Sequence, residues 1–327
     1  MRAPRFWSLA PDQPAARLLA PLGHLYGARA AARMDRPGAR AALPVICLGN
    51  LTMGGAGKTP AALALARMLM ERGHRPAFLS RGYGGRLQGP VAVDPARHGA
   101  AEVGDEPLLL ARLAATVVSR DRPAGAALCA GLGADAILMD DGLQNPSLVK
   151  DLAFAVVDGG AGIGNGLTFP AGPLRAPLHR QWRHIHGLIL VGAGAPGEAV
   201  AREALARGLP VHRATIEADG QDFTGRRWLA FAGIGRPEKF FATLREIGAD
   251  PVATHAFPDH HAYRPGELEG LAREADRLGA ELVTTEKDRV RLPPAFAARA
   301  LPVRLRLADE AALWAEVERA IARPAPP

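Results

Sequence analysis

The chain has 327 residues, of which 48% are hydrophobic and 22% charged, a composition that suits two globular domains and excludes a chain that is mostly disordered. Its two cysteines, Cys47 and Cys129, are too few for a disulfide framework and form no CxxC pair, so we expect a reducing compartment and no structural zinc. The net charge is +7, and seven arginines against two aspartates within residues 1–40 supply +5 of it, which favours a local contact with an anionic lipid surface over nucleic-acid binding by the whole body.

The N-terminal segment, residues 1–40, is predicted to contain a basic amphipathic helix. Within residues 15–33 one helical stripe carries the apolar side chains of Leu18, Leu19, Leu22, Leu25 and Tyr26. Arginines flank this stripe, as is typical of helices that lie in the interface of an anionic membrane; the alternative is a helix packed on the protein's own core. No apolar run approaches the roughly 18 residues that a membrane-spanning helix needs, so we expect a soluble or peripheral protein.

From Pro44 onward, short apolar runs alternate with helical stretches, which predicts an α/β fold: a mostly parallel sheet with helices on both faces. We assign residues 41–222 to this unit and residues 223–327 to a second, smaller α/β domain that closes over it. Strands are expected at 45–48, 77–79, 116–119, 136–139, 153–157, 188–191, 228–232, near 252 and at 281–285. Later helices are expected at 237–247, 265–278 and 309–321.

The strongest motif is VICLGNLTMGGAGKTP, in which a glycine-rich loop follows a strand and opens a helix. The backbone amides of such a loop converge on phosphate oxygens, and the helix N-terminus adds the positive end of its dipole. Lys58 would reach the β- and γ-phosphates, and Thr59 would offer its hydroxyl to Mg²⁺. One departure is that Thr52 stands where the usual pattern has its first glycine. The residues expected to bind the nucleotide are Thr52, Met53, Gly54, Gly55, Ala56, Gly57, Lys58 and Thr59.

Two adjacent acids, Asp140 and Asp141, follow the buried strand expected at 136–139. A P-loop needs a carboxylate at the end of a neighbouring strand to hold Mg²⁺, and two adjacent carboxylates repel unless a cation lies beside them. A metal site is therefore expected here, and a solvated turn is the alternative. With the glycine-rich loop, this pattern predicts that residues 41–222 form a core of the P-loop NTPase type, which hydrolyses or transfers the γ-phosphate of a nucleotide.

A third acidic motif, VGDEP, places Asp105 and Glu106 before a helix expected at 108–115. Both acids could simply be favourable charges near a helix N-terminus, with no further role. If the loop faces the nucleotide, one acid could accept the proton of an incoming hydroxyl while the other helps to hold Mg²⁺.

Two further loops combine glycine with side chains that suit a phosphate on the acceptor. Arg81 lies in SRGYGG, and Asn165 and Arg175 lie in GNGLTFPAGPLRAP. Arginine in such loops favours bidentate phosphate recognition, although a structural turn with a surface arginine is an equal alternative.

The second domain offers two motifs. In FPDHHAY, Asp259 could orient the imidazole of His260 and tune a catalytic group, although a His–His dipeptide is poor support for a metal site. In TTEKDRVRL, Lys287 is one of only four lysines in the chain and could contact the nucleotide or brace the cleft between the domains. Surface residues remain the alternative for both motifs.

Seven motifs in register, GNLTMGGAGKTP, SRGYGG, VGDEP, DDGLQN, GNGLTFPAGPLRAP, FPDHHAY and TTEKDRVRL, closely resemble those of the tetraacyldisaccharide 4'-kinases, the lipid A 4'-kinases of Gram-negative envelope synthesis. The resemblance covers nearly the whole chain. It implies ATP-dependent, Mg²⁺-requiring phosphorylation of the 4'-hydroxyl of a tetraacylated glucosamine disaccharide 1-phosphate at the cytoplasmic face of the inner membrane. The implied partners are the anionic inner-membrane surface and the acylated disaccharide, without nucleic acid or an obligate protein partner.

The resemblance also implies roles for single residues. It makes Asp105 the catalytic aspartate and His260 its partner, with Lys58 acting from the phosphate loop. One departure is Asn145, which stands where the family often has histidine, so any role that needs an imidazole there is in doubt. The implied metal ligands are Thr59, Asp140, Asp141 and Glu106, and the implied substrate contacts are Arg81, Asn165 and Arg175.

The mechanism expected from these assignments is in-line attack of the sugar hydroxyl on the γ-phosphorus, with its proton passing to Asp105, aided by His260. Two other classes stay open from the residues alone. A P-loop GTPase or ATPase of the metallochaperone type would want a cysteine- or histidine-rich transfer motif, which the sequence lacks. A nucleic-acid-binding ATPase would want basic charge accompanied by an aromatic platform.

Overall fold

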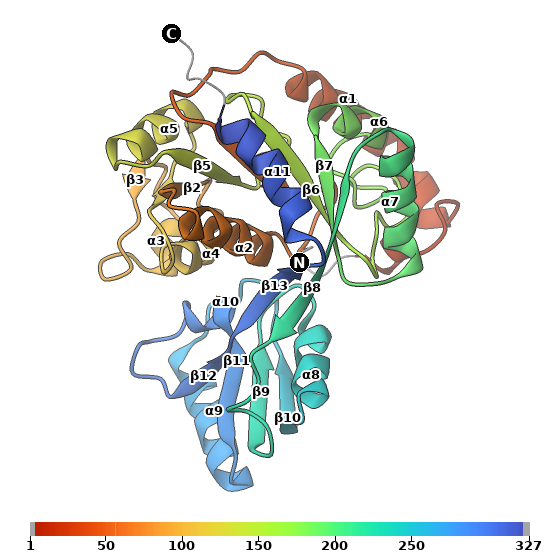
Figure 1. Cartoon of the computed structure of the whole chain (residues 1–327). Coiled ribbons are helices and arrows are strands. Elements are labelled where there is room, and N and C mark those ends of the chain that lie inside the picture. The colour runs from red at the N-terminus through yellow and green to blue at the C-terminus, as the bar shows by residue number, and fades with distance from the viewer. Residues whose placement is uncertain (1–3, 56, 323–327) are drawn as a thin grey trace.

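A nine-stranded sheet forms the centre of the larger of two α/β units in the computed structural model, which describes residues 4–55 and 57–322 (Figure 1). The strand order is β13-β8-β7-β6-β1-β5-β2-β4-β3, and every neighbouring pair is parallel except β3 with β4 and β13 with β8. The strands are β1 (Val45–Gly49), β2 (Pro76–Ser80), β3 (Val91–Ala92), β4 (Thr116–Val118), β5 (Ala136–Asp140), β6 (Leu152–Asp158), β7 (Gly187–Val191), β8 (Val211–Ala218) and β13 (Val303–Leu307).

Both faces of this sheet are covered by helices, as the buried apolar runs predict. In β1, Ile46 and Leu48 point into one core layer while Val45 and Cys47 point into the other. The first layer packs under α2 (Lys58–Glu71), α4 (Asp105–Leu110) and α11 (Glu310–Ile321), and α2 and α11 lie in front of the sheet in Figure 1. The second layer packs under α5 (Arg122–Gly131) and α7 (Ala195–Ala206). Shorter elements are η1 (Arg5–Ser8), α3 (Ala100–Val103), α6 (Leu178–Gln181) and η2 (Trp182–His184).

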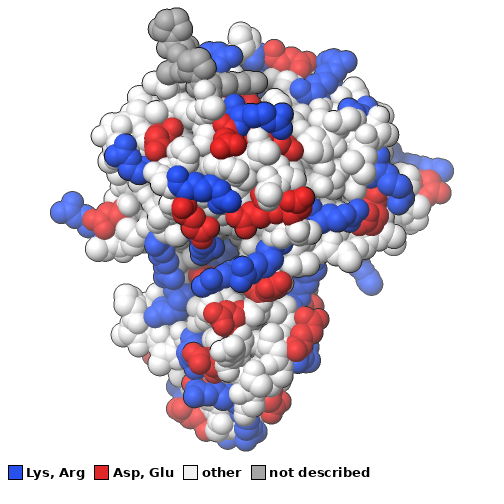
Figure 2. Space-filling view, in the orientation of Figure 1, with Lys and Arg blue, Asp and Glu red and all other residues white. Residues whose placement is uncertain are grey.

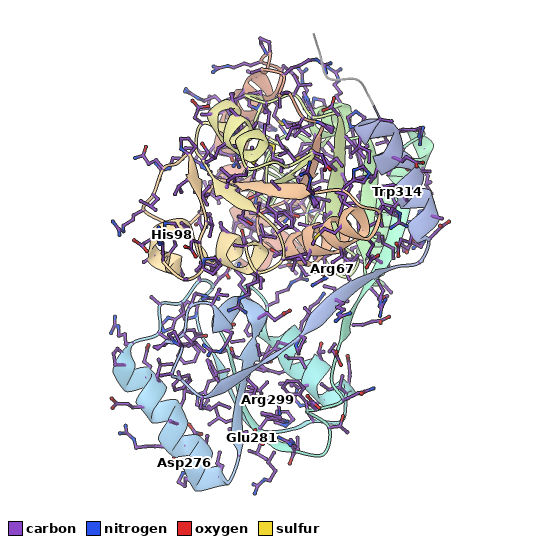
Figure 3. The ribbon with its side chains drawn as sticks, turned by 60° about the vertical axis from the view of Figure 1, so that its left-hand side comes forward. Arg67, His98, Asp276, Glu281, Arg299 and Trp314 are labelled. Atoms are coloured by element: carbon purple, nitrogen blue, oxygen red, sulfur yellow. The ribbon has the colours of Figure 1, made fainter. Side chains whose placement is uncertain are left out.

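The smaller unit has its own parallel sheet, in the order β10-β9-β11-β12, with α8 and α9 on opposite faces. Phe240 and Phe241 of α8 fill one layer, and Leu268 and Leu271 of α9 fill the other. Figure 3 shows Asp276 on α9 at the far end of this unit and Arg67 of α2 at the edge of the large unit that faces it. The elements are β9 (Arg227–Ala232), β10 (Asp250–Ala256), β11 (Glu281–Thr285), β12 (Ala298–Leu301), α8 (Pro237–Glu246), α9 (Pro265–Leu278) and α10 (Glu286–Arg289).

The C-terminal boundary of the second domain differs from the expected 223–327. Strand β13 pairs antiparallel with β8 at the edge of the large sheet, and α11 follows it onto that sheet. Leu305, Leu313 and Val317 are buried in the same core layer as α2, which explains why this segment leaves the small sheet. The second domain is thus inserted between β8 and β13, and two chain connections join it to the core.

The helix expected after VGDEP also differs from its predicted bounds. It begins at Asp105 rather than at Leu108, so both acids of the motif lie inside its first turn. Carboxylates are stabilised there by the free amides of the helix N-terminus.

Helix α1 (Pro14–Met34) forms as predicted, with Pro21 inside it. Its small residues face the protein: an added Cβ at Gly23 would lie 2.9 Å from the Thr168 carbonyl oxygen, so the helix packs closely on the loop around residue 168. The predicted apolar stripe divides, since Leu19 and Tyr26 are half-buried whereas three leucines face outward. Those three are Leu18, Leu22 and Leu25, with exposed fractions of 81%, 55% and 63%.

Neither α1 nor any other helix within residues 4–55 and 57–322 combines the length and apolar character needed to cross a bilayer. The outward leucines recur at i, i+4 and i+7, so they form a single ridge along the helix.

Candidate active site

The loop between β1 and α2 has the backbone of a phosphate-binding loop. Gly54 and Gly57 adopt left-handed φ angles of 98° and 88°, which glycine tolerates and other residues do not. A Cβ at Gly54 or Gly55 would meet no atom within 4 Å, so this part of the loop borders open space. The side-chain amide of Asn50 donates to the Gly54 carbonyl at 2.7 Å and fixes the turn. Thr59 lies in the first turn of α2, and the expected contact at Ala56 falls outside the described residues.

The departure at Thr52 has a structural reason. Thr52 pairs with Leu174 in an isolated antiparallel bridge, and its carbonyl accepts a hydrogen bond from Arg175 Nε at 3.0 Å. The next amide, that of Met53, donates to the Pro173 carbonyl at 2.7 Å. This half of the loop is therefore held in an extended form by the 164–175 loop, and the left-handed turns start only at Gly54.

Asp141 is committed to two cations. Its carboxylate lies 2.8 Å from Lys58 Nζ. Both carboxylate oxygens accept from Arg175 Nη1, Oδ1 at 2.9 Å and Oδ2 at 3.0 Å. Burial alone would raise the pKa of Asp141, but the charges and hydrogen bonds of Lys58 and Arg175 outweigh it and hold that pKa far below the ordinary value. Asp141 also has a φ of 53°, an uncommon backbone state for a non-glycine residue. Its direct role here is to place the P-loop lysine.

Asp140 has the opposite environment. Asp140 is 1% exposed, and within residues 4–55 and 57–322 neither of its carboxylate oxygens has a hydrogen-bond partner. Burial and the nearby charge of Glu106 raise its pKa to about 7. A buried carboxylate without a partner is costly unless a cation binds it, and oxygen ligands beside a phosphate loop suit Mg²⁺. The structure therefore separates the two acids of the DDG motif: Asp141 is paired with cationic side chains, whereas Asp140 is not, and the metal role of Asp140 stays a prediction.

Asp105 and His260 meet across the two domains although 155 residues separate them. His260 Nδ1 lies 2.9 Å from Asp105 Oδ2, and the Glu106 amide donates to Asp105 Oδ1 at 2.9 Å. Asp105 is 4% exposed; burial raises its pKa, but the His260 hydrogen bond and the charges of Lys287 and Arg291 lower it overall. The pair predicted from the resemblance is thus in contact, at the N-terminus of α4.

Glu106 and Lys287 form a second contact between the domains. Lys287 Nζ lies 3.0 Å from Glu106 Oε1 and 3.4 Å from His260 Nε2. Burial lowers the pKa of Lys287, but the charges of Glu106 and Asp105 raise it overall, so it remains an ammonium group. The expectation that Lys287 braces the interdomain cleft agrees with this position.

The three expected substrate contacts lie in different environments. Arg81 follows β2 directly and is exposed at the edge of the sheet that also carries the P-loop and Asp140. Asn165 is buried: its amide group donates to the Ala171 carbonyl at 2.9 Å and its oxygen accepts from the Leu167 amide at 3.1 Å. Arg175 is paired with Asp141, as described above. In this state only Arg81 has an exposed side chain, and the substrate roles of all three stay predictions.

Asn145 forms a local turn rather than a contact with the site. Its side-chain oxygen accepts from the Ser147 amide at 2.9 Å and from the Ser147 hydroxyl at 2.7 Å.

A contact between the domains that the sequence did not predict lies beside the P-loop. Asp158, at the end of β6, accepts bonds from Arg236 at 3.0 Å and 2.8 Å and from Lys239 at 2.6 Å. Arg236 also donates to the Gly55 carbonyl at 2.9 Å. Figure 2 shows that basic side chains gather along the boundary between the two domains on the face in view. The only signal in the sequence was the position of Asp158 at the end of a strand, β6, which neighbours the strand that leads into the P-loop.

Substituting Asp158 tests this contact through its pH dependence. Burial raises the pKa of Asp158, but Arg236 and Lys239 reverse this and lower it from 3.8 to about 2. The ion pairs therefore stabilise the fold fully above about pH 4, and this contribution is lost as the pH falls through 2. We expect Asp158→Asn to lower the free energy of unfolding by about 2 kcal/mol at pH 7, in line with a pKa shift of that size.

Denaturant titrations at several pH values measure this difference. It should be constant from pH 7 to about 4 and shrink below that. Glu281→Gln, which removes an exposed ion pair with Arg226, is the matched control and should change stability little. A difference that grows on acidification would contradict this account of Asp158.

Comparison with known proteins adds independent information. The family model for tetraacyldisaccharide-1-P 4'-kinase matches residues 15–322. A tetraacyldisaccharide 4'-kinase of Methylobacterium radiotolerans is 68% identical over 326 residues, covering 99% of this chain and 100% of that protein. A protein of the same name from a Bradyrhizobium species is 52% identical, covering 98% of this chain and 96% of that protein.

A solved structure is also similar. The crystal structure of the "apo" form of LpxK from Aquifex aeolicus in complex with ATP superposes with a TM-score of 0.75 at 26% identity, covering 94% of this chain and 99% of that one. The family match and this structural similarity favour a kinase over the metallochaperone-type alternative.

Proposed function

The chain belongs to the tetraacyldisaccharide-1-phosphate 4'-kinase family, a family of phosphotransferases, and from this premise we propose how its own residues carry out the reaction. The reaction is ATP-dependent phosphorylation of the 4'-hydroxyl of a tetraacylated glucosamine disaccharide 1-phosphate. The observation that carries the proposal is the meeting of Asp105 with His260 between the two domains, on the same sheet edge as the P-loop.

The P-loop binds the triphosphate. Its glycine-rich backbone offers amides to the phosphate oxygens, the α2 N-terminus adds its dipole, and the ammonium of Lys58 neutralises charge on the transferred group. Asp141 holds the Lys58 side chain in place, and Arg175 in turn holds Asp141.

Asp105 acts as the general base. The 4'-oxygen attacks the γ-phosphorus, the bond from that phosphorus to the bridging β–γ oxygen breaks with its electrons leaving on ADP, and the hydroxyl proton passes to the Asp105 carboxylate. His260 orients this carboxylate through the 2.9 Å contact from Nδ1. Because the two residues come from different domains, closure assembles the pair and excludes water, which would otherwise take the phosphoryl group.

Mg²⁺ fits the remaining residues. Asp140, whose carboxylate oxygens lack partners, and the hydroxyl of Thr59 would hold it, with Glu106 as a further oxygen donor. When bound, the ion neutralises charge on the β- and γ-phosphate oxygens.

The acceptor carries acyl chains, so the enzyme must work at a membrane surface, which we place at the cytoplasmic face of the inner membrane. Each CH₂ group withdrawn from the bilayer costs about 0.8 kcal/mol, which keeps the acyl chains in the lipid. The outward ridge of Leu18, Leu22 and Leu25 offers apolar side chains to that surface. Phe169 lies outside α1 but is 38% exposed and in edge contact with Tyr26 of that helix, so it extends the apolar area. The arginines of residues 1–40 suit anionic headgroups.

One experiment tests the acceptor and the surface together. Wild-type protein should move the γ-phosphate of ATP to the tetraacylated acceptor both in anionic vesicles and in detergent micelles. Changing Leu18, Leu22 and Leu25 to serine should weaken vesicle binding at least about 100-fold, because burying one leucine contributes about 1.5–3 kcal/mol. Turnover in vesicles should fall with it, whereas turnover in detergent should stay near wild type.

The matched control changes exposed apolar side chains elsewhere. Met70, Leu132 and Leu205 are 42%, 46% and 56% exposed and lie outside α1, so their serine variants should bind vesicles normally. Unchanged vesicle binding by the α1 variant would show that this ridge does not contact lipid. Absence of labelled lipid with wild type in both formats would contradict the proposed reaction.

A further inference from the structure

Arg291 lies just after α10 and is almost completely buried, with 6% of its side chain exposed. Its guanidinium reaches carboxylates from both domains: Nε lies 3.4 Å from Asp105 Oδ2 in the core, and Nη2 lies 2.9 Å from Asp288 Oδ1 in the second domain. A buried guanidinium is retained only where its donors find acceptors, so its contacts indicate what it holds in place.

The remaining donors of Arg291 bind the backbone around His260. Nη1 donates to the His261 carbonyl at 3.1 Å and Nη2 donates to the Gly233 carbonyl at 3.0 Å. The Gly233 carbonyl also accepts the His260 amide at 3.0 Å. One side chain therefore ties the loop that carries His260 to the carboxylate that His260 contacts.

Asp288 completes this arrangement and is 0% exposed. Besides Arg291, its carboxylate accepts the Gly233 amide at 2.9 Å, the Tyr263 hydroxyl at 2.7 Å and the Thr285 hydroxyl at 2.6 Å. Tyr263 stands at the other end of the same loop. Asp288 thus fixes both Gly233, directly after β9, and Tyr263, which closes the His260 loop.

The His260 loop needs such support because its backbone is strained. His260 has a φ of 57°, in the left-handed region that residues with a Cβ occupy only at a cost. Gly233 permits the close approach: a Cβ there would lie 3.1 Å from Asp288 Oδ1, His261 Cβ and the Pro258 carbonyl oxygen. The left-handed state at His260 therefore depends on the contacts that surround it.

We propose that Arg291, anchored by Asp288, is a positioning residue for phosphoryl transfer: it holds His260 in its left-handed backbone state with Nδ1 directed at Asp105. This inference rests on the proposed role of the Asp105–His260 pair. Among the described residues, Arg291 contacts neither the P-loop nor the acidic side chains assigned to the metal, so its effect passes through the Asp105–His260 pair. A neutral side chain of similar length would fill the space but would bind none of the carbonyl groups.

The test is a double-mutant cycle between Arg291 and His260, measured as kcat with KM for ATP. Groups that orient a catalytic side chain typically contribute 10- to 100-fold to activity, so we expect Arg291→Met to lower kcat about 30-fold. KM for ATP should stay within about twofold, because the residue acts on the chemical step rather than on nucleotide binding. The kcat of Arg291→Lys should lie between those of wild type and Arg291→Met, since an ammonium group keeps the charge but lacks the planar guanidinium that binds two acceptors.

In the His260→Ala background the same Arg291→Met change should lower kcat by no more than about threefold, because the side chain that Arg291 positions is gone and only its 3.4 Å contact with Asp105 remains. Arg289→Met is the matched control: Arg289 belongs to α10, its side chain donates to the carbonyls of Pro293 and Pro294, and its variant should keep wild-type kcat.

The outcomes separate the two claims. An Arg291 penalty of equal size in both backgrounds would overturn the positioning role while leaving the catalytic pair intact. A His260→Ala protein with wild-type kcat would instead contradict the proposed pair, and the inference with it. If Arg291→Met does not fold, Arg291→Lys and Asp288→Asn supply the same comparison, and a penalty for either that disappears without His260 supports the inference.

Discussion

Replacing Asp105 by asparagine is expected to lower kcat by about 1,000-fold, because an amide cannot accept the proton that the acceptor hydroxyl loses and general-base catalysis contributes about 10²–10⁴-fold. Asparagine is preferable to alanine here. It keeps the volume of a side chain that is 4% exposed, and it leaves an oxygen facing His260 and Arg291. ATP affinity should change little, since Asp105 has no hydrogen bond or ion pair with the part of the P-loop that the structure describes.

Steady-state kinetics with labelled ATP, together with a direct titration of ATP, measure both quantities. Asp276→Asn is a matched control, because Asp276 lies on α9 at the far end of the second domain (Figure 3). A kcat for Asp105→Asn within a few-fold of wild type would remove this carboxylate from the chemistry.

The second large effect is expected at Lys58. Lys58 is 7% exposed and begins α2 directly after the left-handed Gly57, and its ammonium group lies 2.8 Å from Asp141. Lys58→Met should lower kcat/KM for ATP at least about 100-fold, as the loss of one preorganised charge from a transition-state site does. The loss should appear in both kcat and ATP affinity, because the lysine faces the phosphates in the ground state and in the transition state.

Lys58→Arg separates charge from shape. The guanidinium keeps the charge but does not fit the buried position beside Asp141, so we expect it to recover little activity. Thermal unfolding of both variants should remain cooperative, which establishes that the loss lies at the site. A Lys58→Met protein with near-normal kcat/KM would contradict the assignment of this loop to the γ-phosphate.

The parts of the fold that depend on local patterns could be predicted from the sequence. Strand β1 is a continuous apolar run buried on both faces, the loop after it has glycines where φ is positive, and Lys58 begins the helix that this loop was predicted to open. Helix α9 and strand β11 have the predicted bounds because amphipathic spacing and turn residues delimit them.

The parts that depend on long-range pairing could not be predicted. In β13 the sequence VRLRL alternates like any half-buried strand, and nothing local tells whether it joins the small sheet or pairs with β8. Asp105 and His260 were likewise candidates from their own motifs, but only the family resemblance was a reason to place them together. Arg236 and Arg291 stayed hidden because all but four of the 40 basic residues are arginine, so no single one stands out.

The site also refines the interpretation of motifs whose residues were predicted as a group. The DDG acids have opposite environments: Asp141 neutralises Lys58 and Arg175, whereas Asp140 is buried without partners. Sequence could supply both carboxylates but not their division of roles, because that depends on which cations the fold brings to each.

Transfer of the γ-phosphate from labelled ATP to a panel of acceptors tests the central claim most directly. The panel comprises the tetraacylated glucosamine disaccharide 1-phosphate, soluble amino sugars, nucleosides and water, each assayed with wild-type protein and with Asp105→Asn. The account predicts that label enters the acylated disaccharide at its 4'-oxygen, that the soluble acceptors and water gain little, and that the substitution abolishes the transfer. Label that passes mainly to water or to a soluble acceptor, or that reaches the lipid equally well without the Asp105 carboxylate, would contradict it.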